Sequence, residues 1–420
     1  MSFVINTLEF LARLPFNYYT FWYVLSKMKN KHKYIASRLL DMSLGIIPSF
    51  LSLFLKREKN VIVFNSQFNN TFEHNSKALF LHYRNFSSSK MKVYYVVNEP
   101  SLRAELSALF GDTIITNSKL RDVFIILSAK TWVCSSLETP IGGFFHSLRR
   151  NVIHLGHGSP VKSIGLNDES TDFKKRVFYA LNRTNFSYIF SSSQIFDDGW
   201  MKCLNIPSEI IIRGAQARND THVKSLDNRV GFEFGVNSRS ILYAPTWRPF
   251  SDTVLFPFAD MDIDRLRSFL ADNDYFLYLR VHPNFESEID PNFLGENIRV
   301  LSKAFVPDIN SILFDFDVLI TDYSSIYVDY LLTEKPVMFI PYDYEEYRDH
   351  VGFSISYQDY SPGPKPNTFN EFLEELDKLL TCESYFHNER SEANKIMNEF
   401  TIDHAAQNES LITKLLSKNF

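Results

Sequence analysis

The feature of this sequence that most constrains its fold is an alternation of strand-like and helix-like segments that runs through the chain twice. Short apolar runs at residues 61–66 (VIVFNS) and 92–97 (KVYYVV) predict buried strands, and amphipathic runs at residues 75–85 and 101–111 predict helices. Strands that alternate with helices form parallel sheets with helices on both faces. The sequence therefore predicts an α/β protein.

A polar stretch at residues 218–236 interrupts this alternation, which starts again at residues 240–247 (SILYAPTW) and continues through a helix expected at residues 308–316. Such an interruption marks a domain boundary. We expect two Rossmann-like lobes, residues 59–220 and 221–420, and leave open a return of the last helices to the first lobe. Ligands of such sheets bind beyond the carboxyl ends of the strands, which places the site in a central cleft.

Residues 1–58 differ in composition from the rest of the chain. They are apolar and aromatic, and residues 39–55 approach the length of a membrane span but carry Asp41 and Pro48. Basic runs (KMKNKHK and KREK) flank that segment. Apolar helices with basic flanks suit the interface of an anionic membrane. We expect a helical segment that associates peripherally with the cytoplasmic face of the cell membrane; the alternative is a helical cap packed on the main body.

Charge and cysteine content exclude several classes. The formal net charge of -5 argues against a nucleic-acid-binding protein. The three cysteines are far apart and form no CxxC pair, so neither a disulfide framework nor a zinc site is expected. The sequence has no GxGxxG and no GxxxxGK[ST] motif, so a nicotinamide site and a P-loop are unsupported.

A histidine between two glycines follows the strand expected near residue 154. Gly156 and Gly158 flank His157 and allow the backbone to approach a ligand closely, while Ser159 and Lys162 add a donor and a positive charge. A lone histidine is often only a packing residue. The surrounding glycines and lysine favour a functional site here.

Two adjacent serines, Ser324 and Ser325, stand where a buried strand gives way to a helix. The unpaired N–H groups and the dipole of a helix start attract anions, so we expect this turn to hold a phosphate. The alternative is that one side chain simply caps the helix. Asp329 follows four residues after Ser325 on the same helix face, where we expect it to accept hydrogen bonds from ligand hydroxyl groups.

Two further clusters follow predicted strands. Pro245 ends one strand, Thr246 comes directly after it, and Arg248 is a candidate phosphate contact or a surface charge. Arg280 and His282 would point to one face of a strand, because side chains alternate, and would offer two donors to one anionic ligand. Coincidental pairing is the alternative.

In this order the clusters resemble the motifs of the CDP-glycerol glycerophosphotransferase family, whose members include the wall teichoic acid primases and polymerases and related capsule polymerases. Residues 156–162 (GHGSPVK) are similar to its Trp-His-Gly-Thr-Pro-x-Lys motif, and residues 217–220 (ARND) to Pro-Arg-Asn-Asp. Residues 243–248 (YAPTWR) and 321–325 (TDYSS) look the same as the family motifs. Gly156 stands where the family motif has tryptophan, and Ala217 where it has proline.

The resemblance implies a GT-B architecture, an acceptor-side first lobe and a CDP-donor second lobe. It implies transfer of glycerol phosphate from CDP-glycerol to a hydroxyl of a lipid-linked glycan or growing polymer, with release of CMP, in teichoic acid or capsule biosynthesis. No metal and no further cofactor are implied. The alternatives are a CDP-ribitol-dependent or nucleotide-sugar-dependent transferase of the same fold, and a non-catalytic scaffold.

The resemblance also implies roles for single residues. His157 would accept the proton of the acceptor hydroxyl or, in the opposite assignment, stabilise phosphate oxygens in its protonated form. Arg280 and His282 would neutralise charge on the departing CMP. The residues expected to bind substrate are Gly158, Ser159, Pro160, Val161, Lys162, Arg218, Pro245, Thr246, Ser324, Ser325 and Asp329.

Overall fold

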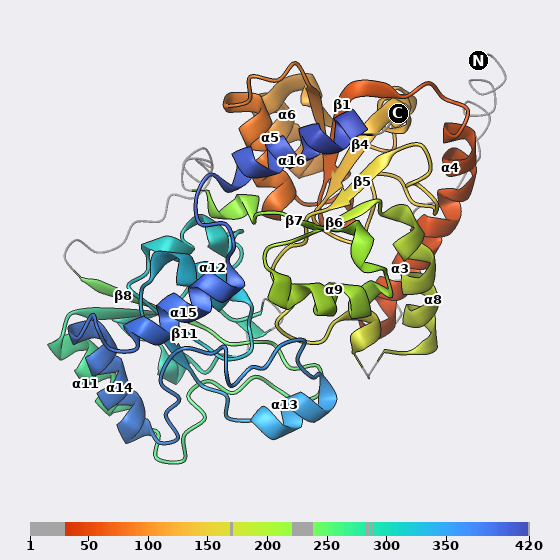
Figure 1. Ribbon diagram of the computed structural model, residues 1–420. Helices are drawn as coiled ribbons and strands as arrows, with labels where there is room; N and C mark the ends of the chain where they lie inside the picture. The colour runs from red at the N-terminus through yellow and green to blue at the C-terminus, as the bar shows by residue number, and fades with distance from the viewer. Residues whose placement is uncertain (1–29, 169–170, 221–237, 283–284, 287–288, 419–420) are drawn as a thin grey trace.

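Two parallel β-sheets, each covered by helices, form the two lobes of the computed structural model (Figure 1). The structure describes residues 30–168, 171–220, 238–282, 285–286 and 289–418. This arrangement confirms the predicted α/β class with two Rossmann-like lobes. The first apolar run, residues 1–25, lies outside the described residues.

The first lobe contains a seven-stranded sheet with the order β3-β2-β1-β4-β5-β6-β7. Every neighbouring pair is parallel. The strands are β1 (Glu58–Asn65), β2 (Lys92–Val96), β3 (Ile114–Ile115), β4 (Ala129–Cys134), β5 (Asn151–His154), β6 (Tyr188–Ser191) and β7 (Ile211–Arg213). The connecting helices are α5 (His74–Asn85), α6 (Pro100–Phe110), α7 (Leu120–Ser128), α8 (Phe173–Asn182) and α9 (Asp197–Leu204).

The second lobe contains a five-stranded parallel sheet with the order β10-β9-β8-β11-β12. Its strands are β8 (Arg239–Ala244), β9 (Tyr275–Leu279), β10 (Ile298–Val300), β11 (Val318–Thr321) and β12 (Val337–Phe339). Its helices are α11 (Ile263–Asp272), α12 (Ile326–Tyr330), α13 (Tyr344–His350), α14 (Phe369–Thr381) and α15 (His387–Met397).

In both sheets the order of the strands reverses beside the first strand of the lobe, between β1 and β4 in one and between β8 and β11 in the other. In open α/β sheets ligands bind at such switch points, beyond the carboxyl ends of the strands. The strands at these points are buried on both faces, as in β11, where all four residues are buried. This explains why they appear in the sequence as unbroken apolar runs.

The last helix, α16 (His404–Lys418), packs on α5 of the first lobe (Figure 1). The Asp220 carboxylate accepts hydrogen bonds from the backbone N–H groups of His404, at 2.8 Å, and Ala405, at 2.7 Å. His82 Nε2 of α5 lies 2.8 Å from Glu409 Oε2 of α16. The chain therefore crosses between the lobes a second time before it ends.

The described part of the N-terminal segment forms α3 (Asn30–Leu44) and α4 (Ile46–Ser52), which pack on the first lobe. Arg38 Nε donates to Glu138 Oε1 at 2.6 Å, and Gly45 lies against the backbone of Gly142. Within the described residues, no single helix has the length and apolarity of a membrane span; the pair formed by residues 35–44 and 46–52, bent by 42°, meets these criteria only when the two are taken together. Membrane association stays a prediction.

The prediction of a helix at residues 308–316 is wrong. Two short 3-10 turns, Ile309–Ser311 and Leu313–Asp315, stand there instead. The carboxylate of Asp308 accepts a hydrogen bond from Asn310 N, at 3.1 Å, and also lies 3.7 Å from Lys77 Nζ of the first lobe. The two 3-10 turns therefore occur where Asp308 contacts the first lobe. Local helix preference cannot reveal a contact of this kind.

Candidate active site

The glycine–histidine loop of the first lobe meets the serine turn of the second lobe at Gly158. A Cβ atom at this position would lie 2.9 Å from Ser325 Oγ and 3.4 Å from Arg218 Nη2. Only glycine allows so close an approach. The structure thus brings together three of the sequence motifs, which carry His157, Arg218 and Ser325.

His157 is exposed, although the surrounding protein approaches it closely enough to desolvate it. Its Nδ1 lies 3.2 Å from the carbonyl oxygen of Ser135. A carbonyl only accepts, so Nδ1 carries the proton of this bond and Nε2 of the neutral ring keeps a lone pair. Desolvation lowers the pKa of His157 from its ordinary value, Arg218 lowers it further, and the bond to Ser135 opposes both. A neutral imidazole of this kind is suited to accept a proton.

Arg218 joins the two lobes through Asp329. Its guanidinium donates to the backbone carbonyl of His157 and to Asp329 Oδ2, and Asn219 Nδ2 donates to Asp329 Oδ1 at 2.8 Å. The side chains of Arg218 and Asp329 are 7% and 2% exposed. First-lobe donors therefore occupy both oxygens of Asp329. This geometry places Asp329 in the contact between the lobes, and its binding of ligand hydroxyl groups stays a prediction.

Asn75, near the start of α5, holds this arrangement in place, and sequence reasoning missed it. Its Nδ2 donates to the carbonyl of Gly156 at 3.0 Å and to Gln216 Oε1 at 2.7 Å, while its Oδ1 accepts from Arg218 N at 3.1 Å. The available signal was its position: a polar residue at the start of the helix that follows β1, beside the switch point of the sheet.

The two serines have different surroundings. Ser324 Oγ accepts a weak hydrogen bond from Ile326 N at 3.4 Å, as the capping alternative expects. Ser325 makes no side-chain cap bond, and its hydroxyl lies beside Gly158. The capping alternative accounts for Ser324 but not for Ser325. Helix α12 is five residues long, shorter than the sequence predicts.

Arg280 and His282 both follow β9 in the second lobe, but they do not lie on a common strand, because β9 ends at Leu279. Arg280 is half-buried, and its Nη1 donates to the carbonyl of Leu301 at 2.9 Å. His282 is exposed, with its ring 5.9 Å from that of Trp247. Burial lowers the pKa of both groups, and nearby Glu286 opposes this in each case.

Pro245 and Thr246 are buried at the end of β8. Thr246 N donates to Asp322 Oδ1 at 2.8 Å, and the buried Thr246 Oγ1 has no hydrogen-bond partner within the described part of the chain. Arg248 does not face a ligand: its buried guanidinium donates to Asp343 Oδ2 at 2.9 Å and to Asp322 Oδ2 at 2.5 Å. The suggested phosphate contact of Arg248 is therefore wrong, because two carboxylates already bind it.

The rest of the first-lobe motif forms a bridge to the second lobe. Ser354 N donates to the carbonyl of Val161 at 2.9 Å, and Ser163 N donates to that of Gly352 at 3.0 Å. Ser159, Pro160 and Val161 are buried; Ser159 Oγ lies 3.1 Å from Ser192 Oγ. Their side chains support the loop. Lys162 is half-buried and burial lowers its pKa, while the nearby Asp322 carboxylate opposes this.

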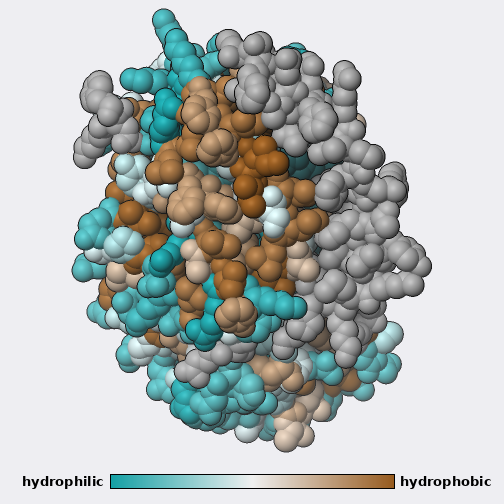
Figure 2. All heavy atoms as spheres, turned by 90° about the vertical axis from the view of Figure 1, so that its right-hand side faces the viewer, coloured by the Kyte–Doolittle hydropathy of each residue, from teal (hydrophilic) through white to brown (hydrophobic). Residues whose placement is uncertain are grey.

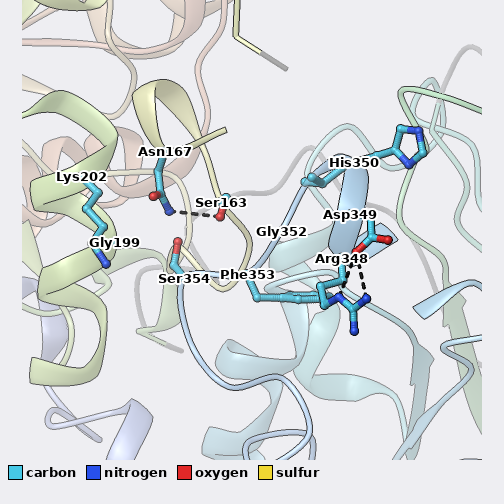
Figure 3. Close-up of a pocket in the computed structure, with 11 residues that line it drawn as sticks. Ser163, Asn167, Gly199, Lys202, Arg348, Asp349, His350, Gly352, Phe353 and Ser354 are labelled. Carbon is cyan, nitrogen blue, oxygen red and sulfur yellow. Dashed lines mark hydrogen bonds and ion pairs between the residues drawn. The ribbon is translucent and has the colours of Figure 1, made fainter. Parts of the chain in front are cut away.

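A cavity of about 560 Å³ lies beside this bridge (Figure 3). Its volume is in the range of small-molecule sites. Figure 3 shows Asn167 pointing toward Ser163, and Arg348 toward Asp349. The positive charges of Lys202 and Arg348, which line the cavity, are each balanced by a carboxylate. Lys202 Nζ lies 2.5 Å from Asp198 Oδ2, and Arg348 Nη2 lies 2.9 Å from Asp349 Oδ1. The lining residues are Ser163, Asn167, Gly199, Lys202, Arg348, Asp349, His350, Val351, Gly352, Phe353 and Ser354.

In the described part of the chain, no three histidine, cysteine, aspartate or glutamate residues are grouped closely enough to hold a metal ion.

Comparison with known proteins gives one family. The sequence model of the family described as CDP-glycerol:poly(glycerophosphate) glycerophosphotransferase matches residues 47–410. A teichoic acid poly(glycerol phosphate) polymerase of Bacillus subtilis is 25% identical over 84% of this chain, which spans about half (49%) of that relative's length. A teichoic acid glycerol-phosphate transferase of Staphylococcus aureus is 24% identical over 80% of this chain and 88% of its own.

Solved structures give the same fold. The structure of the wall teichoic acid polymerase TagF superimposes with a TM-score of 0.69 at 19% identity, covering 92% and 97% of the two chains in one form. A UDP-GlcNAc 2-epimerase from Neisseria meningitidis, bound to UDP-GlcNAc, follows with a TM-score of 0.52 at 13% identity over 86% of this chain and all of the other. At these identities the likeness establishes the architecture alone.

Proposed function

The chain belongs to the CDP-glycerol:poly(glycerophosphate) glycerophosphotransferase family, and on that premise we propose that it transfers glycerol phosphate from CDP-glycerol to a hydroxyl group of a membrane-associated acceptor. The observation that carries the proposal is the meeting of His157, Arg218 and Ser325 around Gly158. The loop that carries a proton acceptor of one lobe meets the turn that carries a hydroxyl group of the other lobe at Gly158. Such an arrangement suits the joining of an acceptor to an activated donor.

The second lobe supplies the groups that bind the donor diphosphate. Ser325 offers a hydroxyl group at the turn after β11, and Arg280 and His282 bring one permanent and one titratable positive charge from the segment after β9, which β8 separates from β11. These groups would stabilise the charge that develops on the phosphate of the departing CMP. The neighbouring strands β8, β9 and β11 fix the three positions relative to one another.

The first lobe supplies the proton acceptor. Nε2 of His157 takes the proton of the acceptor hydroxyl as its oxygen bonds to the phosphorus that carries glycerol. The bond from that phosphorus to the bridging oxygen breaks, and CMP leaves with this oxygen and the electron pair. The neutral tautomer fixed by Ser135 and the lowered pKa support this role over that of a protonated phosphate ligand.

The product we propose is a poly(glycerol phosphate)-type teichoic acid, because the relatives named for glycerol phosphate span most of this chain. CDP-ribitol is the second candidate donor, favoured by a teichoic acid poly(ribitol-phosphate) polymerase that is 27% identical over half of this chain. We also propose that the acceptor is lipid-linked, and capsule synthesis is a further process in which this transfer would serve.

The test is CMP release by the purified protein from CDP-glycerol, CDP-ribitol and UDP-sugars, with and without a membrane extract as acceptor. CMP from CDP-glycerol alone is the expected result, undiminished by EDTA because protein cations do the work proposed here. Release from CDP-ribitol alone would change the donor but keep the site. Release from none of them, with no binding of CDP-glycerol by calorimetry, would favour the scaffold alternative. His157→Ala should lower turnover about 100- to 10,000-fold if His157 is the base.

We further propose that the N-terminal helices bind the cytoplasmic face of the cell membrane. Exposed apolar side chains gather on α4 and the adjoining loop, forming an apolar face visible in Figure 2: Leu44, Ile46, Ile47, Phe50, Phe54, Phe145 and Leu148. Arg149 donates to the carbonyl of Leu53 at the end of this face. Lys130 lies near Arg57, Lys59 and Arg149, and burial together with these cations lowers its pKa. Apolar and basic groups side by side suit an anionic bilayer.

Co-sedimentation with vesicles tests this surface. The double variant Phe50→Asp/Phe54→Asp should lose at least about ten-fold in binding to phosphatidylglycerol vesicles, because each buried phenylalanine contributes about 1.5–3 kcal/mol. Leu109→Asp is the matched control, an exposed apolar residue on α6 of the same lobe. Equal binding by the double variant and the control would refute the membrane role of this face.

A further inference from the structure

We propose that His74, the first residue of α5, binds the acceptor hydroxyl group together with His157 and orients its oxygen for attack. The proposal rests on the proposed function and adds a residue to the acceptor side of the same site. Nothing in the sequence motifs points to His74; its position in the fold does.

The two imidazole rings lie side by side. Their centroids are 5.5 Å apart and their planes are tilted by 40°. A hydroxyl group that donates its proton to Nε2 of His157 would therefore lie close to the ring of His74.

His74 has a polar atom that needs a partner. Among the residues that the structure describes, its buried Nδ1 has no hydrogen-bond partner, while its Nε2 lies 3.6 Å from Glu73. An unsatisfied buried nitrogen is unfavourable, so a ligand that satisfies it gains affinity. A hydroxyl group both donates and accepts, and so fits either tautomer of the ring.

The backbone holds His74 in an unusual conformation. Its φ angle is +65°, in the left-handed region that residues other than glycine adopt uncommonly, with asparagine, aspartate and histidine the more frequent exceptions. The next residue, Asn75, is tied to the carbonyl of Gly156, which precedes His157. The start of α5 and the His157 loop are thus one connected unit. Strain of this kind persists where the surroundings fix it, often at functional sites.

The second lobe completes the surroundings of His74. Lys77 Nζ lies 3.7 Å from Asp308 Oδ2, and Glu73 Oε1 lies 3.6 Å from Lys303 Nζ, so each lobe contributes one acid and one base. Arg218 and the titratable ring of His157 also act on the pKa of His74. Burial and the nearby His157 lower the pKa of His74 to about 3, so the ring is neutral at physiological pH.

The experiment compares three variants in the full-length protein. His74→Gly removes the ring without backbone strain, because glycine accepts positive φ. His74→Asn keeps a donor and an acceptor and also tolerates this conformation. His82→Gln, on the same helix but facing α16, is the control for a lost imidazole. The readouts are KM and kcat with a synthetic oligo(glycerol phosphate) acceptor, the Kd for CDP-glycerol by calorimetry, and the melting temperature.

We expect His74→Gly to raise the acceptor KM and to lower kcat/KM about 5- to 10-fold, the loss of one hydrogen bond, with the donor Kd unchanged. His74→Asn should recover most of this loss, and His82→Gln should match the wild type. Unchanged acceptor kinetics for His74→Gly, or a loss confined to the donor Kd, would overturn the inference while leaving the proposed function intact. If the wild type transfers nothing to this acceptor, the proposed function fails first and the inference falls with it.

Discussion

Removal of the Asp329 carboxylate decides whether this residue joins the lobes or binds substrate. In the structure the carboxylate accepts from Arg218 and Asn219, and its side chain is 2% exposed. Asp329→Ala therefore leaves a buried guanidinium without a counter-charge and a buried amide without an acceptor. Breaking a buried ion pair by removing one partner costs about 3–5 kcal/mol, and the orphaned amide adds to that cost.

The measurements are calorimetric and urea unfolding, together with the Kd for CDP-glycerol. We expect a loss of about 3–5 kcal/mol for Asp329→Ala. The double variant Arg218→Met/Asp329→Leu should recover most of it, because well-packed apolar side chains often replace a buried pair with little loss of stability. Arg218 also binds the His157 carbonyl, so the double variant should stay folded but inactive.

The opposite pattern would refute this reasoning. If Asp329→Ala unfolds within about 1 kcal/mol of the wild type but binds CDP-glycerol ten-fold more weakly, Asp329 contacts the ligand and the sequence-based expectation was right. CDP-glycerol would then replace Arg218 and Asn219 as the partner of Asp329 when it binds.

Two further predictions follow. His157 acts as a base only when neutral and its pKa lies below the ordinary 6.5, so kcat/KM should rise with pH to a plateau whose midpoint lies below pH 6.5; a midpoint above 6.5 in the pH profile would contradict the lowered pKa. In the Glu73–Lys303 pair the side chains are 14% and 44% exposed. Reversing one charge (Glu73→Lys or Lys303→Glu) should lower kcat/KM two- to five-fold, as expected for a pair worth up to about 1 kcal/mol, and the double reversal should restore it. Equal losses in all three variants would show that the pair does not couple the lobes.

The fold and the main motifs were predictable because they depend on local patterns. The strands at the switch points are continuous apolar runs, and the polar clusters follow them directly, as at Ser324 after β11. Parallel strands bring their carboxyl ends to one edge, so the convergence of these clusters followed from the class of fold.

The contacts between the lobes were not predictable in this way. The occupation of Asp329, the anchoring role of Asn75 and the two turns after Asp308 all depend on how one lobe sits against the other. The positive φ angle of His74 is likewise set by these surroundings, because even histidine, one of the residues enriched there, adopts it in only a small share of cases. Arg248 was misassigned because its partner Asp343 lies 95 residues away in sequence.

The return of α16 to the first lobe has a consequence for biosynthesis. Domains usually fold from the N-terminus as the ribosome releases them. Here α5 remains uncovered until the residues beyond His404 have left the ribosome. Until then Asp220 also cannot cap the start of α16. The whole second lobe is translated in that interval, about ten seconds or more at ordinary elongation rates. During translation the half-made first lobe exposes the apolar surface that α16 later covers, and a nascent chain cut short before His404 should be a substrate for chaperones.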